Sequence, residues 1–104
     1  MANKLKMTRS TGNVFVDLGF KPEEAANLAL RTSLMIQVRH AVAKWALTQV
    51  QAAKLLGVTQ SRLNLLLNGK IDLFSIDALV NMLARAGYLT QVRVKRLPVS
   101  KVAV

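Results

Sequence analysis

Residues 47–69 read LTQVQAAKLLGVTQSRLNLLLNG and contain two short helix signals joined by a glycine turn. Thr48 can cap the first helix, and Gln51 three residues later completes a capping box. Gly57 ends that helix because glycine adopts the left-handed conformation at little steric cost. Thr59 then caps a second helix. The stretch therefore predicts two short helices, the second running from residue 60 to about residue 67, with Gly69 placed to end it.

The second predicted helix has one apolar and one polar side. At about 100° per residue, Leu63, Leu66 and Leu67 share the apolar side. The other side carries the candidate base-reading residues Gln60, Ser61, Arg62, Asn64 and Leu65, with Asn68 at its end. In the major groove, Gln and Asn can pair with adenine, Arg with guanine, and Ser with either. The stretch therefore predicts a DNA-binding helix-turn-helix, in which Leu65 contacts either a thymine methyl group or another protein.

The charge distribution supports binding to nucleic acid. The chain has 15 Lys and Arg against 5 Asp and Glu, a net charge of +10. Residues 25–71 contain no acidic residue and include the whole predicted motif. Their basic residues are Arg31, Arg39, Lys44, Lys54, Arg62 and Lys70. Because a surface of one sign suits the neutralisation of phosphates, Lys54 and Lys70 are predicted to contact the DNA backbone.

Helical patterns flank the motif on both sides. Residues 22–46 have apolar residues at three- and four-residue spacing, and Pro22 fits the first helical position. This pattern predicts one long helix or two helices with a bend near residues 32–33. After the motif, Ser75 caps a further helix that Gly87 is placed to end. The expected fold class is mainly α, a five-helix domain with a C-terminal, and possibly an N-terminal, β-strand.

Two segments show the alternation of a strand. Residues 13–20 have the composition of a short extended or packed segment, and residues 88–97 place Thr90, Val92 and Val94 between polar residues. A lone strand leaves an unpaired edge that can pair with another chain. Thr90, Val92 and Val94 are therefore predicted to form the interface of a homodimer, and the alternative is pairing of the two segments within one chain.

The predicted domain spans residues 13–97, between a basic arm at residues 1–12 and a tail at residues 98–104. The arm is either disordered or follows phosphates through Lys4, Lys6 and Arg9. The chain has no cysteine and one histidine, His40, without a second ligand at metal spacing. We therefore expect no metal, no cofactor and no enzymatic activity. Without a long apolar run or a secretion signal, the expected location is the bacterial cytoplasm, at the nucleoid.

The motif resembles the helix-turn-helix of the lambda repressor and Cro, the XRE family, through the pattern T-Q-x-x-x-A-x-x-x-G-V-T-Q-S-x-L-x-x-L-x-N-G. The resemblance implies that Gln49 bonds a phosphate, that Gln60 and Ser61 read bases, and that Asn68 holds the backbone. Thr59 joins this set of expected backbone contacts. Over residues 13–83 the chain also resembles HigA-type antitoxins, with NVFVDLGF at 13–20, PEEAANL at 22–28 and GKIDLFSIDAL at 69–79.

These resemblances imply a repressor that binds the major groove of double-stranded operator DNA as a dimer. The antitoxin resemblance adds a partner, a toxin similar to RelE/ParE ribonucleases, which the chain would neutralise while it represses its own operon. The toxin contact is expected on the outer face of the helix at residues 22–45. Two alternatives remain: a phage-type regulator without a toxin, and a protein-interaction module with weak, non-specific DNA binding.

Overall fold

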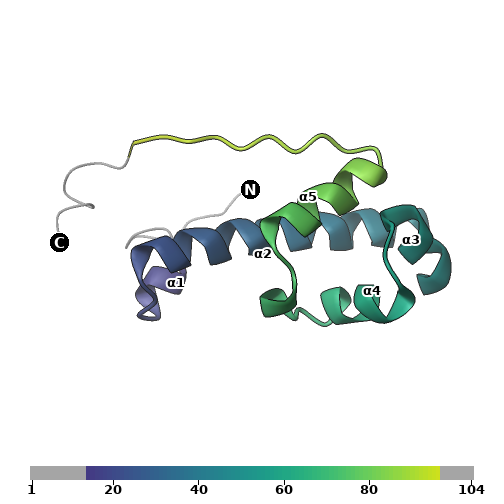
Figure 1. Ribbon diagram of the computed structural model, residues 1–104, viewed down its shortest axis with the longest axis horizontal. Helices are drawn as coiled ribbons and strands as arrows, with labels where there is room; N and C mark the ends of the chain where they lie inside the picture. The colour runs from purple at the N-terminus through teal and green to yellow at the C-terminus, as the bar shows by residue number, and fades with distance from the viewer. Residues whose placement is uncertain (1–13, 97–104) are drawn as a thin grey trace.

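The computed structural model describes residues 14–96 of the 104-residue chain. This range forms α1 (Val14–Asp17), α2 (Pro22–Trp45), α3 (Gln49–Leu56), α4 (Gln60–Leu67), a 3-10 turn η2 (Ile71–Leu73) and α5 (Ile76–Arg85). The expectation of a mainly helical fold with five α-helices is confirmed for these residues (Figure 1). The predicted arm at residues 1–12 and tail at residues 98–104 lie outside the described range.

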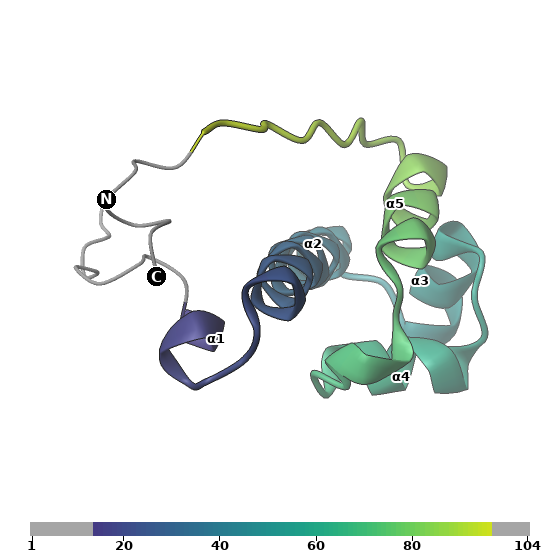
Figure 2. The same ribbon diagram turned by 60° about the vertical axis from the view of Figure 1, so that its left-hand side comes forward.

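The other helices are arranged along the long helix α2 (Figure 1). The short helix α1 packs against α2, and α5 packs against α2 and α3. Figure 2, which looks nearly along α2, shows α1 on one side of it and α3, α4 and α5 grouped on the other. The helix-turn-helix formed by α3 and α4 therefore lies beside the C-terminal half of α2, and α5 packs against both α2 and α3.

Helix α2 is continuous, which decides between the one-helix and two-helix predictions. Pro22 occupies the first turn together with Glu23 and Glu24, whose charges suit the positive end of the helix dipole. The buried residues of α2 continue past the predicted bend; they are Ala25, Leu28, Leu34, Met35, Val38 and Ala41. Although α2 has 24 residues, neither it nor another helix within residues 14–96 is long and apolar enough to cross a membrane.

One apolar cluster joins α2 to the helix-turn-helix and α5. Each of the four helices contributes at least two buried side chains, and Phe74 enters from the connector between η2 and α5. The cluster consists of Leu34, Met35, Val38, Ala52, Ala53, Leu56, Leu63, Leu66, Phe74, Leu79, Met82 and Leu83. Because Leu63 and Leu66 are both 0% exposed, this cluster fixes which side of α4 faces the interior and which faces solvent.

The predicted N-terminal strand is wrong, because residues 14–17 form helix α1. The amide of Gly19 donates to the Val16 carbonyl and that of Phe20 to the Phe15 carbonyl, both at 3.0 Å. This bonding pattern is a Schellman motif, and Gly19 has the positive φ of 97° that the motif requires. The rings of Phe15 and Phe20 meet edge to face at 5.9 Å, which supplies the accompanying apolar contact. The apolar alternation over residues 14–20 therefore belongs to a short helix and its C-terminal cap.

The predicted C-terminal strand is not present within the described residues either. Residues 88–96 leave α5 as an extended run without helix or strand, set apart from the helices in Figures 1 and 2. A strand is defined by its ladder with a neighbour, and the segment expected to pair with it inside the chain is helix α1. The two segments therefore do not pair as strands within residues 14–96. Leu89 and Val94 remain 84% and 88% exposed.

Candidate nucleic-acid interface

Helix α3 begins and ends as its local sequence predicts. Thr48 Oγ1 accepts from the Gln51 amide and Gln51 Oε1 accepts from the Thr48 amide, both at 3.2 Å, which forms the predicted capping box. Gly57 ends the helix with a φ of 75°. A Cβ at Gly57 would also collide with the Arg85 side chain from α5. Glycine is therefore needed at residue 57 for its backbone conformation, and a larger residue there would also have to displace the end of the exposed Arg85 side chain.

The turn from α3 to α4 sets the orientation of the second helix. The Val58 amide donates to the Ala53 carbonyl at 3.0 Å, which closes the end of α3. Thr59 Oγ1 then accepts from the Arg62 amide at 3.1 Å and starts α4. The bounds of α4, Gln60–Leu67, confirm the predicted second helix. Ala53 is 2% exposed, so a small side chain lies buried where α3 meets its neighbours.

Four polar side chains of the helix-turn-helix remain on the solvent side of α4. Gln60, Ser61, Asn64 and Asn68 are all exposed. Within the described part of the chain, none of these side chains makes a hydrogen bond. At 100° per residue they fall within an arc of about 100°. They form one continuous polar stripe, with donors and acceptors that suit the edges of bases.

The other two predicted base-reading residues lie differently. Leu65 is half-buried and packs against the core cluster. The guanidinium of Arg62 donates from Nη2 to the Leu73 carbonyl at 2.8 Å and lies over the Phe74 ring, 4.4 Å from its centroid. Leu73 is 11 residues from Arg62 in sequence, and Phe74 follows it directly. The helical pattern therefore gives no signal for these contacts, which only the fold brings together.

The predicted backbone-contacting residues lie around the ends of α3 and α4. Gln49 is the first residue of α3 and is half-buried. Thr59 is exposed; its oxygen already accepts from the Arg62 amide, and its hydroxyl proton is free to donate. Asn68 caps α4 through its amide, which donates to the Asn64 carbonyl at 3.0 Å. Lys54 and Lys70 are exposed in the last turn of α3 and directly before η2.

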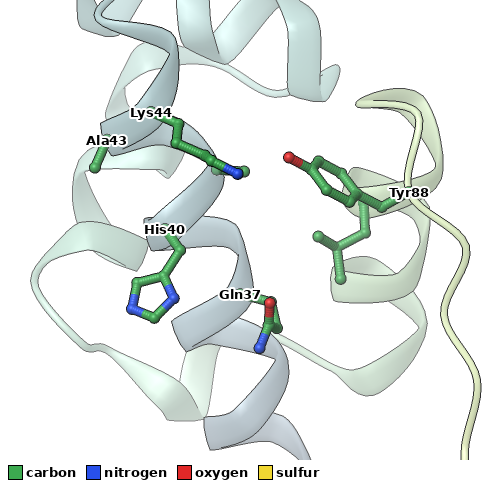
Figure 3. A pocket seen from close by; sticks show the side chains of 7 residues that line it. Gln37, His40, Ala43, Lys44 and Tyr88 are labelled. Atoms are coloured by element: carbon green, nitrogen blue, oxygen red, sulfur yellow. The ribbon is translucent and has the colours of Figure 1, made fainter.

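A separate hollow lies between α2 and the end of α5, with a volume of about 500 Å³. Figure 3 shows Gln37, His40 and Lys44 along α2, with the Tyr88 hydroxyl directed towards the Lys44 ammonium group. None of the lining residues belongs to α3 or α4. The polar stripe of α4 is therefore not part of this hollow and faces solvent.

The comparison with protein families agrees with this geometry. A family model described as a helix-turn-helix domain matches residues 14–95, so the chain belongs to this helix-turn-helix family. Fold and family together define a DNA-binding helix-turn-helix protein. Among curated proteins, none matches the chain.

Proposed function

We propose that the protein is a sequence-specific transcriptional repressor, a regulator rather than an enzyme, that places α4 in the major groove of its operator. The observation that carries the proposal is the exposed polar stripe of α4, in which the side chains of Gln60, Ser61 and Asn64, with Asn68 at its end, make no hydrogen bond within residues 14–96. The buried Leu63 and Leu66 hold the opposite side of α4 in the core. A helix presented in this way can bring its N-terminal residues to the edges of bases.

Phosphate contacts from both sides of α4 would fix its depth and direction in the groove. Lys54 and Lys70 are exposed, and neither has a hydrogen-bond or ion-pair partner in the described range. The Thr59 hydroxyl and the side-chain amides of Gln49 and Asn68 lie at the starts and ends of the same two helices. Such contacts position a protein on DNA without reading sequence, which is the role proposed for these five residues.

We further propose that two copies pair through residues 88–96. A two-fold register centred on Val92 would place Val92 opposite its own copy and Thr90 opposite the copy of Val94. On the other face, Gln91 would then lie opposite Arg93. A register centred on Arg93 would instead oppose two like charges, which destabilises a strand pair. Val92 is 57% exposed in one chain, so the pairing would bury apolar surface that is now in water.

The antitoxin role rests on the resemblance of residues 13–83 to HigA-type antitoxins. In that role the chain would repress its own operon in the bacterial cytoplasm and neutralise a RelE/ParE-like ribonuclease. The outer face of α2 is the proposed contact for the toxin, and Ile36 is 41% exposed on it. The alternative of a protein-interaction module with weak, non-specific DNA binding would use Leu65 as a contact with another protein. Leu65 is half-buried and packs against the core, which favours the DNA-binding role over this alternative.

Footprinting on the DNA directly upstream of the gene tests the repressor proposal. We expect two protected half-sites related by a dyad and about one helical turn apart, because a two-fold dimer imposes its own symmetry on the operator. Uniform protection that needs high protein concentration would contradict sequence-specific binding. A neighbouring toxin gene, and relief of repression when that toxin is in excess, would distinguish the antitoxin from a phage-type regulator.

A further inference from the structure

The segment between α4 and α5 is held by two arginines that come from different helices. Arg31 of α2 donates from Nη1 to the carbonyls of Ile71 and Phe74 at 3.0 and 3.4 Å. Arg62 of α4 donates from Nη2 to the carbonyl between them, that of Leu73, at 2.8 Å. Three of the four carbonyls of residues 71–74 thus receive a guanidinium donor. The connector is thereby tied to α2 on one side and to α4 on the other.

Arg62 is held at its backbone amide and at its guanidinium group. Its amide is bound by the Thr59 hydroxyl at 3.1 Å, and its guanidinium rests 4.4 Å above the centroid of the Phe74 ring. Phe74 is 1% exposed and belongs to the core cluster. A cation over a ring face is stabilised by the ring quadrupole. To reach a base, Arg62 would have to give up the ring and leave the Leu73 carbonyl without its charged donor.

From this geometry we infer that Arg62 is a positioning residue of the recognition helix and does not read bases. It sets the rotation of α4 by tying it to the connector and, through Phe74, to the core. The inference rests on the proposed function, because it concerns the residues through which α4 would read DNA. The reading stripe then consists of Gln60, Ser61 and Asn64. Without Arg62 and Leu65, the centre of the stripe lies roughly 50° around the helix axis from the centre expected from sequence, which is half of the 100° step per residue.

The removal of Arg62 from the reading residues changes the base preference that we expect. Arginine is the side chain that most often pairs with guanine, whereas Gln and Asn pair with adenine. With the Arg62 guanidinium held against the connector, the remaining reading residues are Gln60, Asn64 and Ser61. The half-site should therefore be recognised through adenines facing α4, without an arginine–guanine pair at the position that Arg62 would face.

Side-chain NMR of the full chain tests the position of Arg62 directly. We expect its guanidinium protons to be shifted upfield by the ring current of Phe74, with the signal assigned by its absence in Arg62→Lys. On titration with a duplex of the DNA upstream of the gene, that shift should persist while the Gln60 side-chain amide signals move. No ring-current shift in the free protein, or its loss on binding the duplex, would overturn the inference.

Two substitutions separate positioning from base reading. Arg62→Met should loosen the placement of α4 and weaken binding to the upstream duplex, but it should not relax the base preference at any single position, as measured with single-base variants of that duplex. Arg62→Lys keeps a cation and one donor at the ring and should recover part of the lost affinity. If Arg62→Met instead relaxes the preference at one base pair, as Gln60→Ala is expected to do, Arg62 reads bases and the inference fails. Equal affinities of the unsubstituted protein for the upstream duplex and a scrambled duplex would contradict the proposed function, while the free-protein NMR shift still decides where Arg62 lies.

Discussion

At the scale of single residues, the basic and polar side chains of the helix-turn-helix divide into two groups. Arg31 and Arg62 donate to backbone carbonyls of the connector, and the Thr59 hydroxyl accepts from the first turn of α4. Gln60 and Ser61 are exposed, with side chains that make no hydrogen bond within residues 14–96. The first group holds the fold, and the second is available to DNA.

Gln60→Ala should lower affinity for the specific duplex by about 1–3 kcal/mol and relax the choice of base at one position. The physical reason is the loss of a paired donor and acceptor at the edge of a base. Titration of the upstream duplex and of single-base variants measures both effects. Gln37→Ala, at an exposed position of α2, is the matched control and should bind as the unsubstituted protein does. Intact specificity in Gln60→Ala would place the reading face elsewhere.

Gly57→Ala and Gly69→Ala form a matched pair that separates backbone strain from collision. Both glycines have positive φ, 75° and 77°, so each substitution should cost about 1–2 kcal/mol of stability. Only at Gly57 does a Cβ meet another side chain, that of Arg85, whereas nothing lies within 4 Å at Gly69. Thermal unfolding should therefore show the larger loss for Gly57→Ala, and Arg85→Ala should remove the difference. Equal losses would mean that Arg85 moves away without cost.

At the scale of secondary-structure elements, sequence predicts well what short-range chemistry decides. The capping box of Thr48 and Gln51 and the cap at Thr59 fix the starts of α3 and α4. Each depends on a hydrogen bond between residues three positions apart, which sequence can predict. The sequence of residues 13–20 wrongly predicts a strand. Its apolar residues alternate as in a strand, but the same alternation occurs in the helix end and Schellman motif at residues 15–20. Residues 88–97 carry a strand pattern, but whether a strand forms depends on a partner that one chain does not supply.

Ala53→Leu tests the close packing of α3 against α4 and α5. Ala53 is 2% exposed, so a larger side chain should overpack the core and destabilise the domain by about 1–3 kcal/mol. For a domain of this size, the melting temperature should fall by roughly 4–8 °C per kcal/mol. Ala84→Leu, at an exposed position of α5, should leave the melting temperature nearly unchanged. Equal melting of the two variants would show that the helices have room at Ala53.

At the scale of the whole molecule, charge and fold together determine which basic side chains are available to bind DNA. The acid-free residues 25–71 extend from α2 to η2. Two of their six arginines and lysines, Arg31 and Arg62, are bound to the connector. The other four, which are exposed, are Arg39, Lys44, Lys54 and Lys70. Sequence predicts the sign of this surface, but it could not predict which cations are engaged, because those contacts join residues that are 11 to 43 positions apart.

Lys54→Ala and Lys70→Ala should each weaken binding to all duplexes alike and reduce the salt slope of the binding constant by about one. A phosphate contact releases counterions whatever the sequence, so the ratio between specific and scrambled duplexes should not change. Lys21→Ala, outside the acid-free stretch and exposed before α2, should leave the slope as it is. A slope that is unchanged in Lys54→Ala and Lys70→Ala would remove these two residues from the interface.

The most direct test of the central claim, that the exposed stripe of α4 reads sequence, is the affinity ratio between the upstream duplex and a scrambled duplex at two salt concentrations. Contacts with bases depend on salt far less than contacts with phosphates do. We therefore predict a large ratio that persists at the higher salt while both absolute affinities fall. Equal affinities for the two duplexes, lost together as salt rises, would show that the charge alone binds DNA and would contradict the account.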